Sequence, residues 1–594
     1  MNGVELLLVV IAAIAVSGLS ERKGLQAPLI LVMIGLAVSF IPGLPRLEIG
    51  PELILGLVLP PLLYSTAVEF SFVNFLRNVW AIIGLGVILV IVTALAAGLV
   101  TSAIVPDITV AAGLVLGSVV APSDAVTAEA IGRRLGLPKR VMTILTGESL
   151  INDAAALTMF TITTVAVTHN EDFFISSPVP YFLYGVVVGI VVGTALAWIV
   201  RQIQRRLHDP GLETVLGLVL PFACYMAAEE LHASGVIAVV TAGFIVGHNA
   251  GEAGYAARIQ ERQVWHSLDV LLEAFVFAYM GLQMKFVLVE VTEAGYSLTK
   301  VLLAGVVVLL VVMLIRPAYV LTNHARLVGM RAFYRRQRER HPELREQREQ
   351  HYRERLAKQQ QRREELERRG RLPVGQNGPD PAAVRRQSPV LPLKHDLVIS
   401  WTGMRGVVTL AAAAGIPLLG ASGPFPGRAV IQAIAFIVAV GTLLVQGFTL
   451  PLVIRKLKIS SDTDTEYEAE QRQHATEVTQ KAAAQVIKKA MDDAGDEADP
   501  RALEVLTEQL QRFQQNRQAL QQQAEDAEKA DADQRRARLG AVFGSIRMEM
   551  LDAQRQALTA ERDAWRLDDD IYRETLEQLD YDAAATSARM SSRL

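Results

Sequence analysis

Apolar residues are gathered into long runs over most of this sequence, and short polar stretches separate the runs. Residues 1–330 and 396–454 are almost continuously apolar, whereas residues 331–395 and 455–594 are almost continuously polar. Thirteen runs approach the roughly 20 residues that a helix needs to cross a bilayer. The pattern predicts an all-α polytopic membrane protein with about 13 transmembrane helices and excludes a soluble globular fold for the apolar part. The predicted spans are residues 4–20, 27–43, 52–69, 79–102, 109–131, 139–168, 180–201, 212–230, 234–248, 266–289, 301–325, 396–417 and 427–454.

The polar stretches divide the chain into four parts. Residues 1–330 are predicted to form a membrane transport domain of eleven helices, which residues 396–454 complete with two more. Residues 331–395 are a basic insertion, and residues 455–594 are a tail rich in Ala, Gln and Glu at helical spacing. This composition predicts long amphipathic tail helices that associate as in a coiled coil.

The charge of the loops predicts the side of the membrane on which each loop lies. Loops that are rich in Lys and Arg remain in the cytoplasm. If the N-terminus lies outside, Arg133 and Arg134 fall inside, as do Arg205 and Arg206, whereas the acidic turn 290–293 falls outside. An odd number of spans then places the C-terminal tail in the cytoplasm. The membrane that the protein spans is expected to be the cell membrane.

The two polar parts carry opposite charge. Residues 331–371 contain fifteen Lys or Arg and eight Asp or Glu, a local charge of +7. Residues 461–594 contain 18 basic and 29 acidic residues, a charge of −11. A polybasic segment beside the membrane can bind anionic lipid, although a solvated helix or a loop explains the same composition. No nucleic-acid partner and no cofactor are expected.

Two simpler classes of protein are excluded by the N-terminus and the cysteine content. No Lys or Arg precedes the first apolar run, so a retained membrane helix is expected there rather than a secretory signal. Cys224 is the single cysteine, which excludes a disulfide framework and metal sites built on several thiolates.

The fifth run contains a helix breaker next to a carboxylate. Its sequence is VLGSVVAPSDAVTAEAI, in which Pro122 removes a backbone donor and is followed by Ser123 and Asp124. A charged side chain in a membrane helix costs several kcal/mol and is a functional candidate by default. Irregular backbone at this depth is tolerated where it lines a cavity. The combination predicts an oxygen-rich site for a small alkali cation or a proton.

The sixth run, LTGESLINDAAALTMF, adds polar residues at helical spacing. Glu148 and Asn152 lie four residues apart on one face, and Ser149 and Asp153 lie four apart on the adjoining face. A carboxylate that can hold either a proton or a cation, but not both, is the minimum that an exchanger requires. Asp153 is the stronger candidate for this role, and Glu148 is the stronger candidate for a structural partner.

Other ionisable residues occur in four further runs. Glu69, near a predicted membrane edge, is either a site ligand or an interfacial charge, and Glu273 lies in mid-run. Arg316 precedes Pro317, and Arg405 lies between two glycines. A buried Arg needs a carboxylate partner, and both arginines compete for Glu148. The glycines around Arg405 predict a second interrupted helix in the twelfth run, and paired interrupted helices indicate a transporter site.

At these residues the chain resembles the monovalent cation/proton antiporters, the sodium/proton exchangers of the NhaP/NHE type. Six segments carry the resemblance in the family's order and cover the membrane part. The chain departs from the family in having Ala121-Pro122-Ser123-Asp124 where a Thr-Asp-Pro motif is frequent, and in its long basic insertion. The segments are LPPLLYSTAV at 59–68, APSDAV at 121–126, GESLINDAAA at 147–156, LLEAFVFAYMGL at 271–282, RPAYV at 316–320 and GMRGVVTLA at 403–411.

The resemblance implies a fold and a set of roles. It implies an inverted repeat, two crossed discontinuous helices and a homodimer. It implies that Asp153 carries the cation and the proton, and that Glu148 pairs with an arginine. It also implies that Na⁺ is bound by Asp153 together with three further residues, and that an Asn152–Asp153 pair exchanges one cation for one proton without net charge. Those three residues are Ser123, Asp124 and Ser149.

The expected function is therefore antiport of Na⁺ or Li⁺ against H⁺, with no enzymatic reaction. A K⁺/H⁺ antiporter or a cation channel would use the same types of ligand. An intramembrane aspartyl protease with Asp124 and Asp153 as its pair is a weaker alternative, because it leaves Arg316 and Arg405 without a role. A receptor that signals through its tail is a third alternative.

Overall fold

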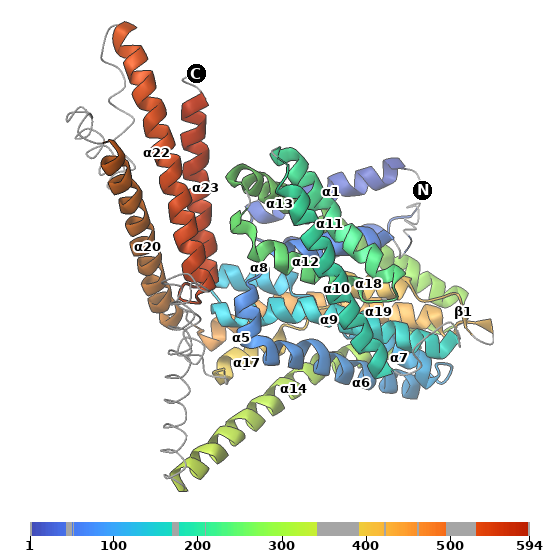
Figure 1. Cartoon of the computed structure of the whole chain (residues 1–594). Helices are drawn as coiled ribbons and strands as arrows, with labels where there is room; N and C mark the ends of the chain where they lie inside the picture. Colours follow the sequence, from blue (N-terminus) through green and yellow to red (C-terminus); the bar gives the residue numbers. More distant parts are fainter. Residues whose placement is uncertain are drawn as a thin grey trace. The chain divides into compact units, whose positions relative to one another are not determined.

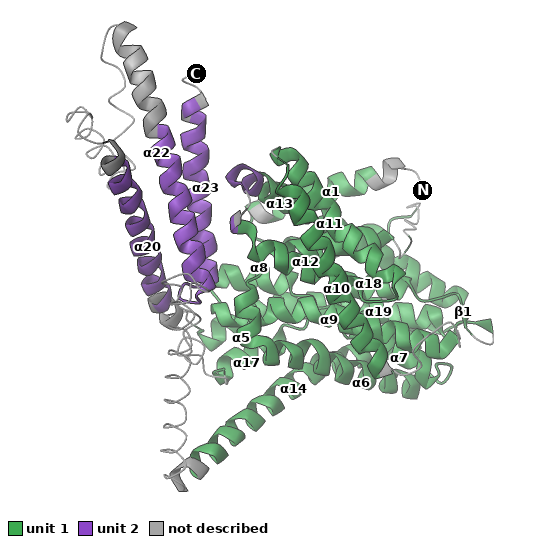
Figure 2. Cartoon of the chain, viewed as in Figure 1, with its two compact units in different colours: residues 1–250, 260–356, 388–464 green, residues 251–259, 357–387, 465–594 purple. Residues whose placement is uncertain are grey.

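The structure, a computed structural model, is almost entirely helical. It describes residues 3–42, 50, 53–168, 178–207, 209–252, 254–340, 391–420, 423–459, 462–494 and 530–591. The chain divides into two compact units (Figure 2). The first unit is residues 1–250, 260–356 and 388–464, and the second unit is residues 251–259, 357–387 and 465–594. The helices of the first unit, which we call the membrane unit, are shown in Figure 1. In chain order they are α1 (Gly3–Arg22), α2 (Ala27–Ser39), η1 (Ile54–Val58), α4 (Leu59–Glu69), α5 (Phe72–Ile83), η2 (Gly84–Ile88), α6 (Leu89–Ile104), α7 (Val110–Val120), α8 (Val126–Leu135), α9 (Lys139–Thr168), α10 (Pro178–Gln204), α11 (Pro210–Glu230), α12 (Gly235–His248), α13 (Tyr255–Glu293), α14 (Leu298–Arg340), α17 (Leu393–Trp401), α18 (Val407–Ala414) and α19 (Arg428–Leu457).

Short polar residues fix where several of these helices begin. The hydroxyl groups of Ser71, Thr109 and Ser234 accept hydrogen bonds from backbone amides in the first turns of α5, α7 and α12. Asp209 caps α11 in the same way, with Pro210 as the first helical residue. Gly136 closes α8 in a left-handed conformation (φ 69°) that favours glycine. Each cap pairs backbone groups that have no partner within the helix.

Two helices are interrupted, at both places where the sequence predicts a break. α7 ends at Val120 and the helix resumes as α8 at Val126, so the Pro122 segment is not helical. α17 ends at Trp401 and α18 begins at Val407. The two non-helical segments touch, because the Asp124 amide donates to the Met404 carbonyl over 2.7 Å. A small antiparallel hairpin, β1 (Leu419–Gly420) and β2 (Gly423–Pro424), follows α18.

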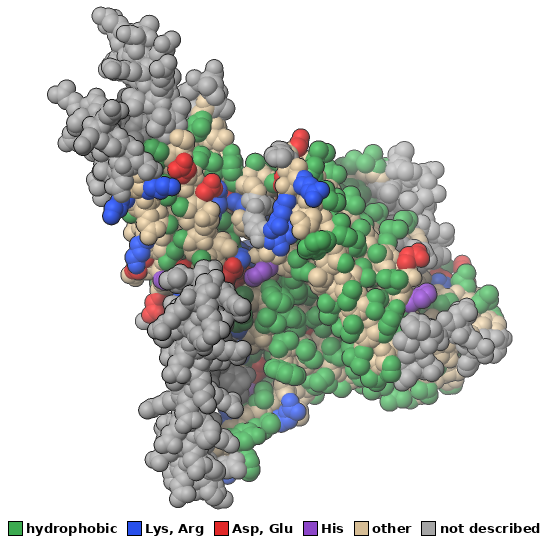
Figure 3. All heavy atoms as spheres, in the orientation of Figure 1, with side chains coloured by type: hydrophobic (Ala, Val, Ile, Leu, Met, Phe, Trp, Pro, Cys, Tyr) green, Lys and Arg blue, Asp and Glu red, His purple; other side chains and the backbone are tan. Residues whose placement is uncertain are grey.

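The membrane unit has an apolar exterior. Seven helices among the described residues are long and apolar enough to cross a membrane, and several shorter apolar helices accompany them. Large apolar side chains are exposed along α10, α11 and α14, and hydrophobic side chains dominate this face of the unit (Figure 3). A soluble protein does not expose so large an apolar surface. The chain is therefore a multi-pass helical membrane protein. The count of 13 spans and the inverted repeat stay predictions.

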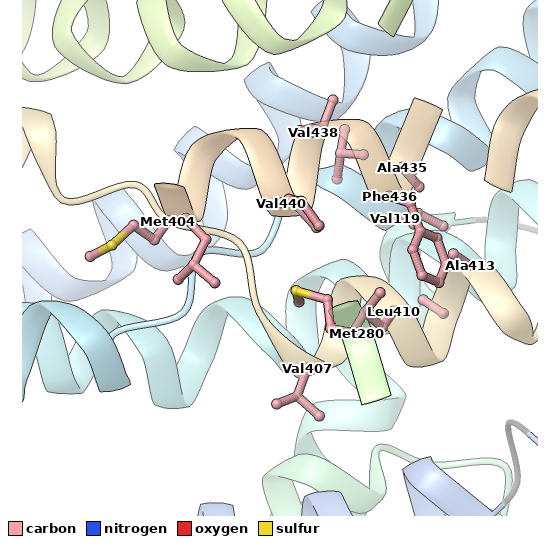
Figure 4. Packing of buried hydrophobic residues seen from close by; sticks show 14 of the residues in the cluster. Val119, Met280, Met404, Val407, Leu410, Ala413, Ala435, Phe436, Val438 and Val440 are labelled. Carbon is pink, nitrogen blue, oxygen red and sulfur yellow. The ribbon is translucent and has the colours of Figure 1, made fainter. Parts of the chain in front are cut away.

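Small residues let the helices approach closely around the broken segments. α6 packs on α7 so tightly that a Cβ atom at Gly117 would lie 2.0 Å from the Ala94 carbonyl oxygen. Beside the second break, Leu410 of α18 belongs to a buried cluster with Val119 of α7, Met280 of α13 and Phe436 of α19 (Figure 4). This packing holds irregular backbone in protein rather than in lipid.

The second unit contains the tail helices α20 (Asp462–Ala494), α22 (Ala530–Asp563) and α23 (Asp569–Ser591). Its core includes Leu551, Leu558, Ile571 and Leu576. Residues 251–259, which include the first turn of α13, belong to the same unit. There Arg258 donates through Nε to Asp580 over 2.7 Å, and both side chains are buried.

Part of the basic insertion is helical. α14 continues beyond the predicted span 301–325 to Arg340, so the first residues of the insertion extend that helix. The rest of the predicted lipid-binding segment 331–371, from residue 341 onward, lies outside the described residues. Residues 495–529 of the tail lie outside them as well. The prediction of anionic-lipid binding therefore stays a prediction.

Candidate functional site

A cavity lies where the first break meets α4, α9 and α18. The polar residues that line it are Thr66, Asp124, Ser149, Asp153 and Thr409. The space open to the centres of water molecules is about 60 Å³, against the roughly 10–15 Å³ that one water requires. The cavity therefore has room for a small cation together with a few waters. Its apolar lining residues include Leu59, Leu62, Leu63, Pro122, Val126, Leu150, Val407 and Val408.

Asp153 and Asp124 both line this cavity, but they differ in their hydrogen-bond partners. Oδ1 of Asp124 accepts a hydrogen bond from the Val126 amide over 2.8 Å, at the first residue of α8. No described residue forms a hydrogen bond or ion pair with the Asp153 carboxylate, and the side chain is buried except toward the cavity. Asp124 is thus anchored at a helix N-terminus, which favours negative charge, whereas Asp153 has its oxygens available for a proton or a cation.

The second break packs directly against the Asp124 carboxylate at Gly406. A Cβ atom at Gly406 would lie 1.8 Å from Oδ2 of Asp124, so only a glycine at this position leaves room for the carboxylate. Together with the hydrogen bond from the Asp124 amide to Met404, this contact ties the two non-helical segments together at the cavity. The carboxylate therefore lies between the two interrupted helices.

Arg405 neutralises the end of α7. Its Nε donates to the Val120 carbonyl over 2.9 Å, Nη2 donates to the Ala121 carbonyl over 3.4 Å, and Nη1 donates to the Gly403 carbonyl. Carbonyl groups at a helix C-terminus carry partial negative charge, which a guanidinium stabilises. Arg405 therefore replaces the water that these carbonyls would otherwise require.

Glu148 pairs with Arg316 rather than with Arg405. Nη1 of Arg316 donates to Oε1 of Glu148 and Nη2 donates to Oε2 over 2.7 Å, with both side chains about 97% buried. Nε of Arg316 donates to the Ile399 carbonyl over 2.8 Å. The two-pronged pair thus joins α9, α14 and α17 in the interior. Sequence alone left both arginines open as partners.

Ser123 and Asn152 extend this ion pair instead of lining the cavity. The Ser123 hydroxyl donates to Oε1 of Glu148 over 2.8 Å. Nδ2 of Asn152 donates to the Ser123 carbonyl over 2.7 Å and to its hydroxyl over 3.0 Å. Both residues fix the broken segment to α9, immediately behind Asp124 and Asp153. Ser123 thus has a structural position outside the cavity lining, and its role as a ligand stays a prediction.

Glu69 and Glu273 lie outside the cavity lining. Glu69 is the last residue of α4 and is exposed. Glu273 lies on α13, four residues after Asp269. Oδ1 of Asp269, one turn before Glu273, accepts a hydrogen bond from Ser65 of α4 over 2.8 Å.

Three polar residues were missed by the sequence analysis. Asp269 could have been found from its spacing of four residues to Glu273 on one helix face. Glu129, which accepts a hydrogen bond from the Thr146 hydroxyl, follows the first break in the run already singled out. Thr409 gave no signal, because a threonine in an apolar helix ordinarily bonds to its own backbone.

Comparisons with known proteins agree on one family. A family model described as sodium/hydrogen exchanger, transmembrane, matches residues 6–347. An uncharacterised Na⁺/H⁺ exchanger of Mycobacterium tuberculosis is 27% identical over 581 residues, which cover 97% of this chain and 95% of that protein. A sodium, potassium, lithium and rubidium/H⁺ antiporter of Bacillus pumilus is 27% identical over 500 residues, covering 82% of this chain and 66% of that protein.

A solved structure shares the fold. The sodium proton antiporter MjNhaP1 from Methanocaldococcus jannaschii, solved at pH 8, aligns with a TM-score of 0.53 and 18% sequence identity. The alignment covers 76% of this chain and 97% of that chain. The likeness in fold thus extends over nearly all of that antiporter.

Proposed function

Because this chain belongs to the sodium/hydrogen exchanger family, we propose that it exchanges Na⁺ or Li⁺ for H⁺ across the cell membrane through Asp153. The family makes the chain a membrane transporter of cations and protons rather than an enzyme, so the protease alternative falls away. The observation that carries the proposal is the cavity in which Asp153 and Asp124 share an apolar surround beside two interrupted helices. Asp153 has no protein partner there among the described residues.

Competition for Asp153 couples the two ions. With a cation bound, the carboxylate is neutralised by Na⁺, to which Asp124 and Ser149 supply further oxygens from the cavity wall. With a proton bound, the carboxyl group is neutral by itself. An empty, charged Asp153 in an apolar cavity is costly. The transporter therefore changes its accessible side when it is loaded with one ion or the other, and both ions cannot be bound together.

The exchange is proposed to be electroneutral. Asn152 is uncharged, and its Nδ2 donates hydrogen bonds to Ser123. Asp153 therefore contributes the single carboxylate of the pair. One cation moving inward for one proton moving outward transfers no net charge. The membrane potential, about 2.3 kcal/mol per charge per 100 mV, then does not drive the cycle.

K⁺ is the second candidate cation. The Bacillus pumilus relative carries sodium, potassium, lithium and rubidium in its name. A cavity with room for waters accepts a larger cation by losing one of them. Carboxylate and hydroxyl ligands suit every alkali cation, so cavity size rather than ligand type decides between them.

The family relation also supports a proposal for the assembly and orientation of the protein. We infer a homodimer with the N-terminus outside and the tail in the cytoplasm, and a contribution to pH homeostasis. The positive-inside distribution of the loops supports the orientation. The acidic tail is interpreted as a regulatory addition to transport rather than as a receptor.

Flux in proteoliposomes tests the proposal. A trapped pH dye would report proton movement after addition of Na⁺, Li⁺, K⁺ or choline, with the membrane potential clamped or free. Cation-specific alkalinisation that is independent of voltage is expected for wild type. Asp153→Asn, which keeps the size of the side chain but cannot ionise, should lose the exchange and keep the fold.

Two results would contradict this proposal. Exchange by Asp153→Asn at a rate near that of wild type would remove the carboxylate from the mechanism. Cation movement without any pH change would indicate a channel. The matched control is Asp107→Asn, which changes a carboxylate outside the cavity in the same way.

A further inference from the structure

Thr409 carries a buried hydroxyl for which the described residues offer no hydrogen-bond partner. Its side chain is 99% buried, and its Oγ1 meets neither a donor nor an acceptor among the described residues. A buried hydroxyl that forms no hydrogen bond costs about 1–3 kcal/mol, so natural proteins contain few of them. The position of Thr409 in the cavity wall, with Asp124 and Asp153, gives this hydroxyl a use.

The helix break removes one partner that this hydroxyl would otherwise have. Several threonines inside apolar helices donate to the carbonyl four residues earlier, as Thr66 does to Leu62 over 2.9 Å and Thr158 does to Ala154 over 2.7 Å, although Thr164 of α9 does not. Thr409 is the third residue of α18, so the residue four positions earlier is Arg405, in the non-helical segment. No helical carbonyl is present there to accept the hydrogen bond.

We propose that Oγ1 of Thr409 is a ligand of the transported cation. This inference rests on the proposed function and adds to it a residue from the second interrupted helix. Asp124, Ser149 and Asp153 line the same cavity from the first break and from α9. A neutral hydroxyl adds an oxygen without adding charge, so it raises cation affinity while leaving a one-for-one exchange electroneutral.

The hydroxyl also connects the cation to α18. Asp153 and Ser149 lie on α9, and Asp124 lies on the first broken segment. With Thr409 as a further ligand, a bound cation contacts both interrupted helices, whereas a proton on Asp153 contacts neither. The cation-loaded and proton-loaded forms therefore differ in how α18 is held.

Thr127 provides a matched control for this hydroxyl. It is also 99% buried, its Oγ1 also has no partner among the described residues, and it lies in the first turn of α8, directly after the other break. Thr127 does not line the cavity. Removing its hydroxyl therefore reproduces every feature of the Thr409 change except access to the cation.

The test compares Thr409→Val, Thr409→Ser and Thr127→Val in proteoliposomes, with Na⁺, Li⁺ and K⁺ as separate probes. Thr409→Val should raise KM for the best cation about tenfold, the equivalent of about 1.4 kcal/mol, with a smaller change in kcat. It should also change the ratio of KM values among the three cations. Thr409→Ser should restore both, and Thr127→Val should behave as wild type.

The outcomes separate this inference from the proposed function. If wild type shows no cation-dependent proton flux, the proposed function fails. If wild type exchanges and Thr409→Val keeps the wild-type KM values, Thr409 is not a ligand and its hydroxyl bonds to water. If Thr409→Val does not reach the membrane, Thr409→Ala decides in its place, and unchanged KM values in that variant overturn the inference.

Discussion

The carboxylates at this site differ in whether the protein gives them a hydrogen-bond or ion-pair partner. Asp124 accepts a hydrogen bond from a backbone amide, and Glu148 accepts hydrogen bonds from a guanidinium group. Both carboxylates therefore have fixed partners. Asp153 has none among the described residues, although it lies one helical turn from Ser149 and five residues from Glu148. Because Asp153 alone of these three carboxylates lacks a fixed partner, it can change its occupant while Asp124 and Glu148 keep the scaffold in place.

The buried ion pair should contribute much more to stability than a pair near the surface. Glu148→Gln leaves Arg316 charged and buried without its carboxylate, which should lower the free energy of unfolding by about 3–5 kcal/mol. The matched change is Glu290→Gln, because Glu290 pairs with Arg428 over 3.4 Å and both side chains are partly exposed. That change should cost less than about 1 kcal/mol.

Thermal unfolding in detergent measures both variants. A melting temperature for Glu148→Gln equal to that of Glu290→Gln would show that the buried pair does not hold the membrane unit together. The double variant Glu148→Gln, Arg316→Gln should recover part of the loss, because neither side chain is then left charged in the interior.

At the scale of helices, the breaks were easier to predict from sequence than the partners across them. Pro122 and the glycines at 403 and 406 are local signals, and both interruptions are present in the structure. The choice between Arg316 and Arg405 was open, because each lies beside a helix breaker and each can meet a buried carboxylate. It depends on how α14 and the two broken segments cross, which no local pattern records.

The free hydroxyl of Thr409 was hidden for a related reason. Its sequence context, GVVTLAAAA, is that of an ordinary apolar helix. A threonine there is expected to bond to the preceding turn, and it is the interruption before Val407 that removes this turn. Such a residue is found by placing the helix end first and then asking which hydroxyls have lost their carbonyl.

The close contact between the two breaks gives a prediction at this scale. Gly406→Ala places a Cβ atom where Oδ2 of Asp124 lies, so the carboxylate or the second break must move. Exchange should fall at least about tenfold, because displacement of a reacting group by about 1 Å is costly. Gly18→Ala, at a helical glycine with no atom within 4 Å of the added Cβ, should exchange normally. Initial rates of proton flux compare the two variants, and equal rates would contradict the prediction.

At the scale of the whole chain, the tail unit has its own electrostatic support. Arg566 donates two hydrogen bonds to Glu561, over 2.6 Å and 2.5 Å, and His474 lies 3.1 Å from the same carboxylate. The Arg566 guanidinium, and then His474, hold the pKa of Glu561 below its usual value of 4.5. A depressed carboxylate pKa stabilises the folded form above pH 4.5, and this stabilisation is lost as the pH falls through the depressed value.

Acid should therefore loosen the tail in part through Glu561. Between pH 5 and pH 3, hydrogen exchange in residues 530–591 of the full chain should rise beyond its intrinsic pH dependence. Glu561→Gln should raise exchange at pH 7 and reduce the further rise in acid. Glu574→Gln, whose partner Arg472 is about half exposed, should follow wild type. Identical pH profiles for wild type and Glu561→Gln would show that this carboxylate does not support the unit.

The pairing of Glu148 with Arg316 also has a consequence for biosynthesis. The two residues are 168 positions apart in the chain. A ribosome that adds about 5–20 residues per second makes Arg316 roughly 8 to 34 s after Glu148. During that interval α9 enters the bilayer with a carboxylate that has no arginine to meet. Insertion of α14 therefore completes an ion pair whose first half entered the membrane with α9 much earlier.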